Sequence, residues 1–439
     1  MNMRECTQGT PVIGTLGASS TFTPSTQSPS RPGVVSAEAP VFLIRAAQSK
    51  DVSTFLKLAR MVYFINLPPD ERIIADKVTH SSKCFGKAAG VKEDKPSGKS
   101  RKRSGGGMAA METDSDLFVF ALDDLETGGV VGTSQVRAHQ GGPGNPNWSM
   151  QLTEKKFFSP ALGQGTTHTV GKLYGDETGP SEIGGLILQP SHRGHRLRPG
   201  RLLSFVRFHF IALYRHLFAD RILAEMMAPV STEGDNVFWD HFGRKFVPVK
   251  YAEADRFCQH NRGFIPELLP KEEIYITLFP LEVQNMVGVV SRETIPARRL
   301  LESLGFRYRN FIDPFDGGPH LDAPTSDITL VKATKPGVLG KSIAADRCDG
   351  YGIVSVLHKD GQFFAIESPY SLNDGELRVP AESMTLMKAT PGMASGATPL
   401  ERPDDAAADA QSASTTKKRR SAGKSEGKST GKKTGKSGR

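Results

Sequence analysis

The sequence lacks any run of about 18 apolar residues, the length that a membrane-spanning helix needs, so we expect no membrane contact. The first twenty residues also lack the continuous apolar core of a secretory signal. Cysteine is scarce: Cys6, Cys84, Cys258 and Cys348 lie far apart, and none belongs to a CxxC pair. This spacing argues against a disulfide scaffold or a zinc ribbon, and it favours a reducing cytoplasmic location.

Acidic residues almost vanish from the end of the chain. Residues 417–439 hold ten Lys or Arg residues and one Glu, a balance equal to the whole formal net charge of +9. The remainder of the chain is therefore near neutral, and the pI of 9.3 describes a tail. Such a tail can contact nucleic acid non-specifically through the phosphates; the alternative is a tail that only aids solubility.

The composition divides the chain into distinct segments. Residues 1–40 are rich in Ser, Thr, Pro and Gly without periodicity, so we expect a disordered extension. Residues 41–335 are predicted to form a folded domain, interrupted by a basic, glycine-rich flexible insertion at 87–112. A small β module is expected at 336–390, followed by a disordered Lys-rich tail at 391–439.

The expected elements alternate between strands and helices, which is typical of a mixed α/β core. Glycine and proline mark several boundaries, such as Pro296 near a helix start and Gly305 at its end. The predicted elements are two strands joined by ETGG at 116–138, a strand at 181–190, an apolar helix at 200–218, a strand at 221–230, a short helix at 236–246 that turns into a strand at Gly243, a helix and strand at 294–313, and a hairpin at 351–370.

The segment ILQPSHRGHRLRPGRLLSF, residues 187–205, joins the apolar strand to the apolar helix through an Arg- and Gly-rich loop. Gly194 and Gly200 allow backbone N–H groups to approach a ligand closely, and the helix N-terminus adds a partial positive charge. Arg193 and Arg201 add full charges. The loop therefore predicts a pyrophosphate-binding site; the alternative is an ordinary loop of solvated arginines.

Two histidines in this loop, His192 and His195, have no third metal ligand near them in the sequence. Both lie among arginines, which disfavour a bound cation. We therefore predict no metal site.

The succession of strand, Arg/Gly loop, apolar helix, strand and F-W-x-x-x-G-x-x-F helix resembles the GCN5-related N-acyltransferase fold. In that fold the loop holds the pyrophosphate of acyl-CoA, and the preceding strand pairs with the pantetheine arm. The resemblance thus implies that Leu186, Ile187 and Leu188 contact acyl-CoA. The expected fold class is α/β (α+β), a mixed sheet with flanking helices, a small C-terminal β module and disordered ends.

The resemblance extends to one family, the arginine N-succinyltransferases, from about Phe42 to Lys335. It is carried by SEIGGLILQP, AEMMAPVSTEGDNVFWDHFGRKF, FIPELLPKEEIYITLF and above all GFRYRNFIDPFDGGP. Members transfer succinyl from succinyl-CoA to the α-amine of L-arginine. The resemblance implies this activity in arginine catabolism, succinyl-CoA as a co-substrate with no permanently bound cofactor, and a homo-oligomer. Leu186 falls where the family contacts succinyl-CoA.

The sequence departs from the family at one important position. The family's proton-donor histidine precedes a run x-x-T-x-P-A, and Ser291 occupies that position here. A hydroxyl cannot replace a histidine as an acid near pH 7, because its pKa is far too high. His320, in DGGPHL, is a candidate substitute, and Glu182 at the start of the strand is a candidate general base. Their alternatives are a surface histidine and a solvated carboxylate.

A guanidinium substrate favours a carboxylate partner that accepts two hydrogen bonds. Glu225, Asp313 and Asp316 are the candidates for this role. Two other functions stay open: a divergent N-acyltransferase acting on another amine or acyl-CoA, and a catalytically weak protein that binds acyl-CoA or polyanions.

Overall fold

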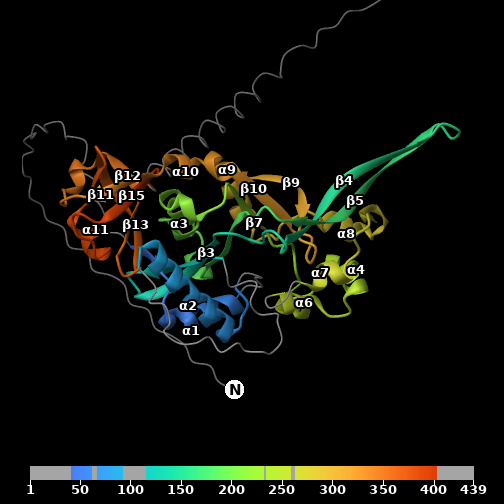
Figure 1. Cartoon of the computed structure of the whole chain (residues 1–439), viewed down its shortest axis with the longest axis horizontal. Coiled ribbons are helices and arrows are strands. Elements are labelled where there is room, and N and C mark those ends of the chain that lie inside the picture. The colour runs from blue at the N-terminus through green and yellow to red at the C-terminus, as the bar shows by residue number, and fades with distance from the viewer. Residues whose placement is uncertain (1–40, 62–66, 92–114, 232–233, 259–262, 403–439) are drawn as a thin grey trace, which may run out of the picture. The chain divides into compact units, whose positions relative to one another are not determined.

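The computed structural model describes residues 41–402 except 62–66, 92–114, 232–233 and 259–262 (Figure 1). Its strands form a 15-stranded sheet in the order β12-β15-β11-β14-β13-β1-β2-β3-β6-β7-β10-β9-β4-β5-β8. The strands are β1 Phe42–Ala46, β2 Leu117–Asp124, β3 Gly129–Arg137, β4 Asn147–Ser159, β5 Gln164–Asp176, β6 Ser181–Leu188, β7 Arg221–Glu225, β8 Ile274–Tyr275, β9 Arg307–Ile312, β10 Pro319–Pro324, β11 Lys335–Leu339, β12 Gly350–Leu357, β13 Phe363–Asn373, β14 Glu376–Arg378 and β15 Ala394–Pro399.

Helices flank this sheet, which confirms the predicted mixed α/β class. The helices are α1 Val52–Arg60, α2 Glu71–Ala88, α3 Pro199–Leu213, α4 Val237–His241, α5 Gly243–Phe246, α6 Tyr251–Cys258, α7 Phe264–Leu268, α8 Leu281–Met286, α9 Ile295–Leu304, α10 Thr329–Ala333 and α11 Ala381–Leu386. No helix within these ranges is long and apolar enough to cross a membrane.

The central strands position the candidate site. Strand β6 pairs in parallel with β7 at Ser181–Ile222 and Glu182–Leu223, and the two strands then separate. Strand β6 continues along β3, whereas β7 continues along β10. Gly185 has a left-handed φ of 55° within the irregular β3–β6 register, a conformation that favours glycine. Beyond Glu182, the β7-facing edge of β6 therefore has no strand partner in the described part of the chain.

Helix α3 packs deep in the protein because most of its residues are apolar on every face. Phe210 on this helix is fully buried and contacts aromatic rings of α2, β2 and β13, including Phe85, Phe118 and Phe363. His209 is also buried, and its two ring nitrogens hydrogen-bond to hydroxyls of β12 and β15. Helix α3 thus joins the central strands to the C-terminal strands.

The C-terminal strands form a closed ring in the order β12-β15-β11-β14-β13, because β13 also pairs with β12. Strand β13 pairs with β1 as well and so joins this barrel to the central strands. The predicted hairpin at 351–370 is confirmed as β12–β13. The boundary predicted at residue 390 was wrong, because β15 (Ala394–Pro399) completes the barrel.

Other sequence predictions have mixed outcomes. The ETGG hairpin is confirmed as β2–β3, and Gly305 ends α9 with a left-handed φ of 114°. The strand predicted after Gly243 was wrong, because the chain continues as α5. Gly243 itself lies against the ring of Trp239, where a side chain would clash.

The predicted insertion at 87–112 starts too early, since α2 extends to Ala88. Its remainder, the extension at 1–40 and the basic tail at 417–439 lie outside the described residues.

A second apolar cluster lies beside the central strands. Trp239 and Phe238 of α4 pack there with Phe242, Met150 of β4 and Ile312 of β9. Together with α5–α8, this cluster supports the strand ends that carry the candidate site.

We predict that Phe210→Ala lowers the free energy of unfolding by about 3–5 kcal/mol, because it empties the centre of an aromatic cluster. Urea denaturation followed by circular dichroism measures this change. Leu268→Ala in α7, where Leu268 is 48% exposed, is the control and should change stability by less than about 0.5 kcal/mol. A loss under about 1 kcal/mol in Phe210→Ala would contradict the assigned role of this ring.

Candidate active site

Two ionisable side chains meet where β7 ends. His320 of β10 lies directly opposite Glu225 of β7 in the antiparallel register. Its Nε2 is 3.9 Å from Oε1 of Glu225, and the imidazole is 5% exposed. Glu225 Oε1 also accepts a hydrogen bond of 3.0 Å from Nδ2 of Asn147 on β4. The histidine predicted as a substitute proton carrier is thus buried beside a carboxylate.

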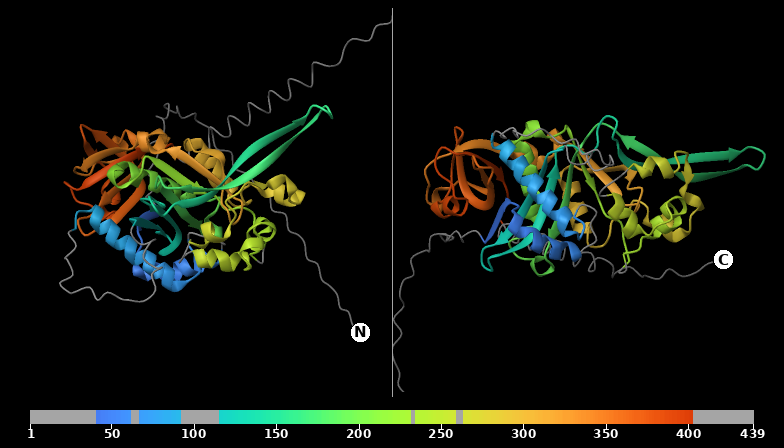
Figure 2. Two further views of the ribbon diagram at one scale, coloured as in Figure 1. Left: turned by 45° about the vertical axis from the view of Figure 1, so that its right-hand side comes forward. Right: turned by 60° about the horizontal axis from the view of Figure 1, so that its bottom comes forward.

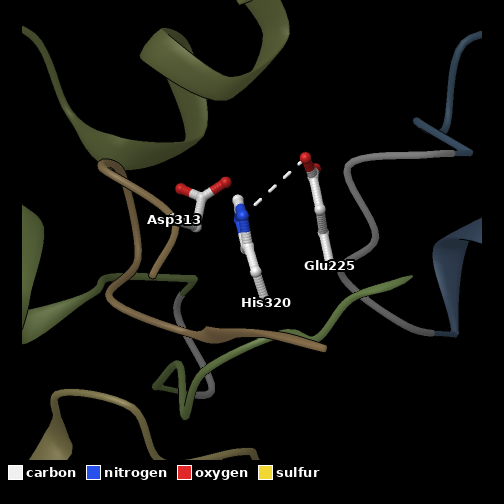
Figure 3. A group of neighbouring side chains, drawn as sticks. All are labelled: Glu225, Asp313 and His320. Atoms are coloured by element: carbon white, nitrogen blue, oxygen red, sulfur yellow. Dashed lines mark ion pairs between the residues drawn. The ribbon is translucent and has the colours of Figure 1, made fainter. Parts of the chain in front are cut away.

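Asp313 approaches the same imidazole from the end of β9, so that His320 lies between two carboxylates (Figure 3). Burial raises the pKa of Asp313 to about 7, and the negative charges of Asp316 and Glu225 act in the same direction. Its Oδ1 accepts hydrogen bonds from the N–H groups of Phe315 and Asp316. This carboxyl can therefore exchange a proton near neutral pH.

Asp316 has a different environment. Its two carboxylate oxygens accept hydrogen bonds from Gly318 N at 2.7 Å and Ala228 N at 2.9 Å. Burial raises the pKa of Asp316 to about 6, although these two bonds oppose the shift. Because both oxygens are engaged by the backbone, the geometry favours a role in shaping the turn over the predicted contact with substrate.

Ser291 is brought to the same end of β7. Its N–H donates to the carbonyl of Met227 at 2.9 Å, and its hydroxyl lies 2.7 Å from that of Thr294. The side chain is only 4% exposed. Ser291, at the position where the resemblance implies a histidine, thus lies beyond the end of β7 that carries Glu225, and its hydroxyl bonds within its own turn.

Glu182 lies on the same face of the sheet as Glu225. It pairs with Leu223, and Leu223 and Glu225 point to one face because they are two residues apart on β7. The strand rise places the two carboxylate-bearing positions about 7 Å apart along the strands. Glu182 is 3% exposed, and its Oε2 is 4.0 Å from Nε of Arg137 on β3. The predicted base therefore stands where β6 and β7 separate.

The residues predicted to contact acyl-CoA lie along β6 and the following loop. Leu186 and Leu188 are half-buried on β6, whereas Ile187 is buried against α1 and α2. Gly194, with φ of 77°, and Arg193 are both exposed in the loop. The structure thus brings an exposed glycine and arginine to the end of the unpaired edge of β6.

The helix that follows this loop begins at Pro199, after Arg198 in a left-handed conformation. Gly200 lies in its first turn, close to Leu188. Arg201, predicted to contribute charge to a pyrophosphate site, lies in this first turn, and its guanidinium forms an ion pair of 3.5 Å with Glu367 of β13. The barrel therefore supplies a counter-charge to the start of α3.

The loop histidines have structural partners. His192 Nε2 is 3.1 Å from Oδ2 of Asp124, and both His192 and His195 lie edge-on to Phe42. These contacts fasten the loop to β1 and β2.

A metal ion could fit elsewhere. The ligand atoms of Glu225, Asp313 and His320 all lie within 4.8 Å of one another. The sequence predicted no metal ligand among them, because the three residues come from three different strands or strand ends. Elemental analysis of the purified protein shows whether these three side chains hold a metal ion.

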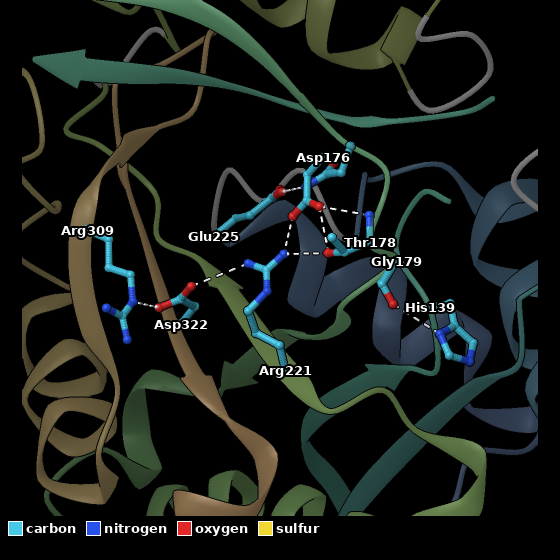
Figure 4. A network of polar contacts seen from close by, with 9 residues as sticks. His139, Asp176, Thr178, Gly179, Arg221, Glu225, Arg309 and Asp322 are labelled. Carbon is cyan, nitrogen blue, oxygen red and sulfur yellow. Dashed lines mark hydrogen bonds and ion pairs between the residues drawn. The ribbon is translucent and has the colours of Figure 1, made fainter. Parts of the chain in front are cut away.

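A polar network that sequence reasoning missed aligns these strands (Figure 4). Arg221 of β7 bonds Asp176 and Thr178 on one side and Asp322 of β10 on the other, and Arg309 of β9 also binds Asp322. Burial opposes ionisation of Asp176, but the hydrogen bonds from Thr178 and Arg221 hold its pKa below the usual value. The network thus fixes the register that sets Glu225 opposite His320.

Comparison with known proteins identifies relatives. A family model described as the arginine N-succinyltransferase beta subunit matches residues 42–330. Arginine N-succinyltransferases of Shigella dysenteriae and Citrobacter koseri are each 32% identical over 298 residues, covering 67% of this chain and 78% of the relative. Arginine/ornithine succinyltransferase subunit AI from Pseudomonas aeruginosa shares the fold, with a TM-score of 0.65 and 23% identity over 82% of this chain and 99% of that one.

We predict that Asp313→Asn weakens the pH dependence of stability. The pKa of Asp313 is raised from 3.8 to about 7. The contribution of this carboxyl to folding stability is therefore fully present below pH 3.8 and is lost as pH rises through 7. The asparagine variant lacks this loss. Between pH 4 and 7 its free energy of unfolding should therefore fall by roughly 2–4 kcal/mol less than that of the wild type.

Urea denaturation at a series of pH values tests this expectation. Asp346→Asn, at an exposed position before β12, is the control and should follow the wild-type profile. An unchanged slope in Asp313→Asn would show that its carboxyl ionises as readily in the native as in the unfolded state.

Proposed function

This chain belongs to the arginine N-succinyltransferase family, and we propose that His320, held between Glu225 and Asp313, accepts the proton of the attacking amine. The reaction is transfer of a succinyl group to the α-amine of L-arginine, with succinyl-CoA as the proposed co-substrate. The observation that carries the proposal is the buried imidazole with one carboxylate on each side.

The chemistry requires such a group. An α-amine with a pKa near 8 is largely protonated at neutral pH and cannot attack a thioester until it loses a proton. The neutral nitrogen then forms a C–N bond with the thioester carbonyl carbon, and the C–S bond breaks. The ammonium releases its first proton to solvent; as the neutral nitrogen attacks, His320 takes a second proton from it and delivers that proton to the departing thiolate, while the adjacent carboxylates stabilise the imidazolium.

The proposed position of acyl-CoA follows from the separation of β6 and β7. The unpaired edge of β6 offers backbone groups to the pantetheine arm and N–H groups to polarise the thioester carbonyl. Leu186 and Leu188 would flank this arm, and Arg193, Gly194 and Gly200 would surround the pyrophosphate at the start of α3. Arg201, paired with Glu367, would contribute from the side of the barrel.

The serine at the family's histidine position is then consistent with activity. The hydroxyl of Ser291 hydrogen-bonds to that of Thr294 within its own turn. His320 supplies a titratable group at the same end of β7, so the proton transfer moves to another residue. Glu182 remains a second candidate for the base, since it lies on the same face with Arg137 as counter-charge.

Assembly, organisation and location complete the proposal. The family model and the solved relative are both named as subunits, which supports an oligomer, and we propose that this chain forms a homo-oligomer. We assign transfer to residues 41–334 and propose that the barrel at 335–399 braces α3. The free thiols of Cys84, Cys258 and Cys348 support a cytoplasmic location.

The direct test is incubation of the full chain with succinyl-CoA and L-arginine, following thiol release and product mass. Ornithine and acetyl-CoA are tested in parallel, since a divergent acyltransferase would prefer one of them. Appearance of succinylarginine supports the proposal. Thiol release only with another acceptor would overturn the arginine assignment.

We predict that His320→Asn lowers kcat for succinyl transfer by about 100-fold or more, because it removes the proton acceptor. Ser291→Ala, which removes only the hydroxyl that bonds Thr294, should stay within about threefold of wild type. Glu182→Gln should lower kcat less than His320→Asn does. The reverse order, with Ser291→Ala inactive and His320→Asn active, would exclude His320 as the base.

A further inference from the structure

The β4–β5 hairpin extends far beyond the strands that flank it. Its two strands of 13 residues pair along their whole length, from Asn147–Asp176 to Ser159–Gln164. Other strands flank it only near its base, where β9 pairs with residues 150–151 and β8 with residues 170–171. Residues 153–169 are here called the arm: its lower part contacts residues 273–277, and its tip projects beyond the neighbouring elements in Figures 1 and 2.

The arm exposes large apolar side chains. Phe158 is 69% exposed and Leu162, at the turn, is 75% exposed. Leu278 and Leu281 are 79% and 69% exposed next to the arm, where the hydroxyl of Thr277 bonds His168 of β5. A two-stranded ribbon is marginally stable alone in water, and a cluster of exposed apolar groups marks an interaction surface.

We propose that the arm is the docking surface for a second copy of this chain, with β4 of one arm antiparallel to β4 of the other about a two-fold axis. The inference rests on the proposed homo-oligomer and adds the surface that forms it. Two paired arms make a four-stranded ribbon, which satisfies the exposed edge of β4 and covers Phe158 and Leu162.

The charges along β4 favour this self-pairing. Glu154 is followed by Lys155 and Lys156, so an antiparallel partner can place a lysine opposite Glu154 on each side of the axis. A two-fold interface uses the same patch on both copies and therefore needs a self-complementary one. The arm together with Leu278 and Leu281 approaches the roughly 20 residues a side of a standard interface.

The pattern fits a lipid surface less well. The exposed apolar side chains are not confined to the turn but continue beside the arm at Leu278 and Leu281. Acidic groups line the same ribbon, since Glu154 lies on β4 and Glu273 binds Lys155. At a lipid surface these carboxylates would be repelled by anionic headgroups, whereas lysines are attracted to them.

The first test is the mass of the full chain in solution by analytical ultracentrifugation. We expect wild type to be dimeric or a higher even oligomer, and Phe158→Asp/Leu162→Asp to weaken self-association at least 100-fold. Met61→Asp, at a position 55% exposed after α1, is the matched control and should associate as wild type does. Circular dichroism verifies that each variant is folded.

The second test locates the contact without substitution. Carbodiimide treatment of a mixture of ¹⁴N- and ¹⁵N-labelled protein should link Glu154 of one copy to Lys155 or Lys156 of the other. The Lys155–Glu273 pair within each chain is the internal control for the reaction.

Three results would overturn the docking surface: a monomeric wild type, association unchanged in the arm variant, or binding of the wild type to anionic vesicles that the variant loses. Succinyl transfer is measured on the same samples. A dimer without transfer counts against the proposed reaction alone, and a monomer with transfer counts against the docking surface and the homo-oligomer but not against the reaction.

Discussion

The parallel pairing of β6 with β7 for two residues, followed by their separation, is the constraint on which the site depends. The pairing at Glu182 sets the two strands side by side, and the separation leaves one edge of β6 unpaired. Strand β7 then pairs with β10, which brings Glu225 opposite His320. The glycine at position 185, in a left-handed conformation, permits the irregular register that accompanies the change. The edge proposed to bind acyl-CoA and the proposed proton-transfer group thus both depend on one departure in strand pairing.

Burying several carboxylates beside His320 is energetically unfavourable, and nearby hydrogen bonds offset part of this cost. Each carboxylate of the cluster has a polar partner: Glu225 has Asn147, Asp313 has the turn that follows it, and Asp316 has Gly318 and Ala228. These bonds do not return the pKa of Asp313 to its usual value, since burial keeps it at about 7. The same low-polarity environment that destabilises the charged carboxyl makes it useful in proton transfer near neutral pH.

Local pattern predicted the elements that depend on local chemistry. The ETGG turn, the apolar helix α3 and the Gly305 stop follow from side-chain periodicity and glycine conformation, and the GFRYRNFIDPFDGGP run identified the family. The pairing of His320 with Glu225 could not be predicted this way, because it depends on the register of two strands distant in sequence. Likewise, nothing local distinguishes the backbone-bound Asp316 from Asp313, and the exposed arm lacks the alternation of apolar and polar residues that identifies a strand.

The arm and the site share their supporting contacts, and this links assembly to chemistry. Asn147 at the base of β4 holds Glu225, and Asp176 at the base of β5 holds Arg221, two residues at opposite ends of β7. A ribbon pinned at its tip by a second copy would fluctuate less at its base. Because Glu225 lies 3.9 Å from His320, restraint of β4 would also restrain the carboxylate beside this imidazole. The position of the proposed base would then depend on the sheet register on one side and on the hairpin on the other.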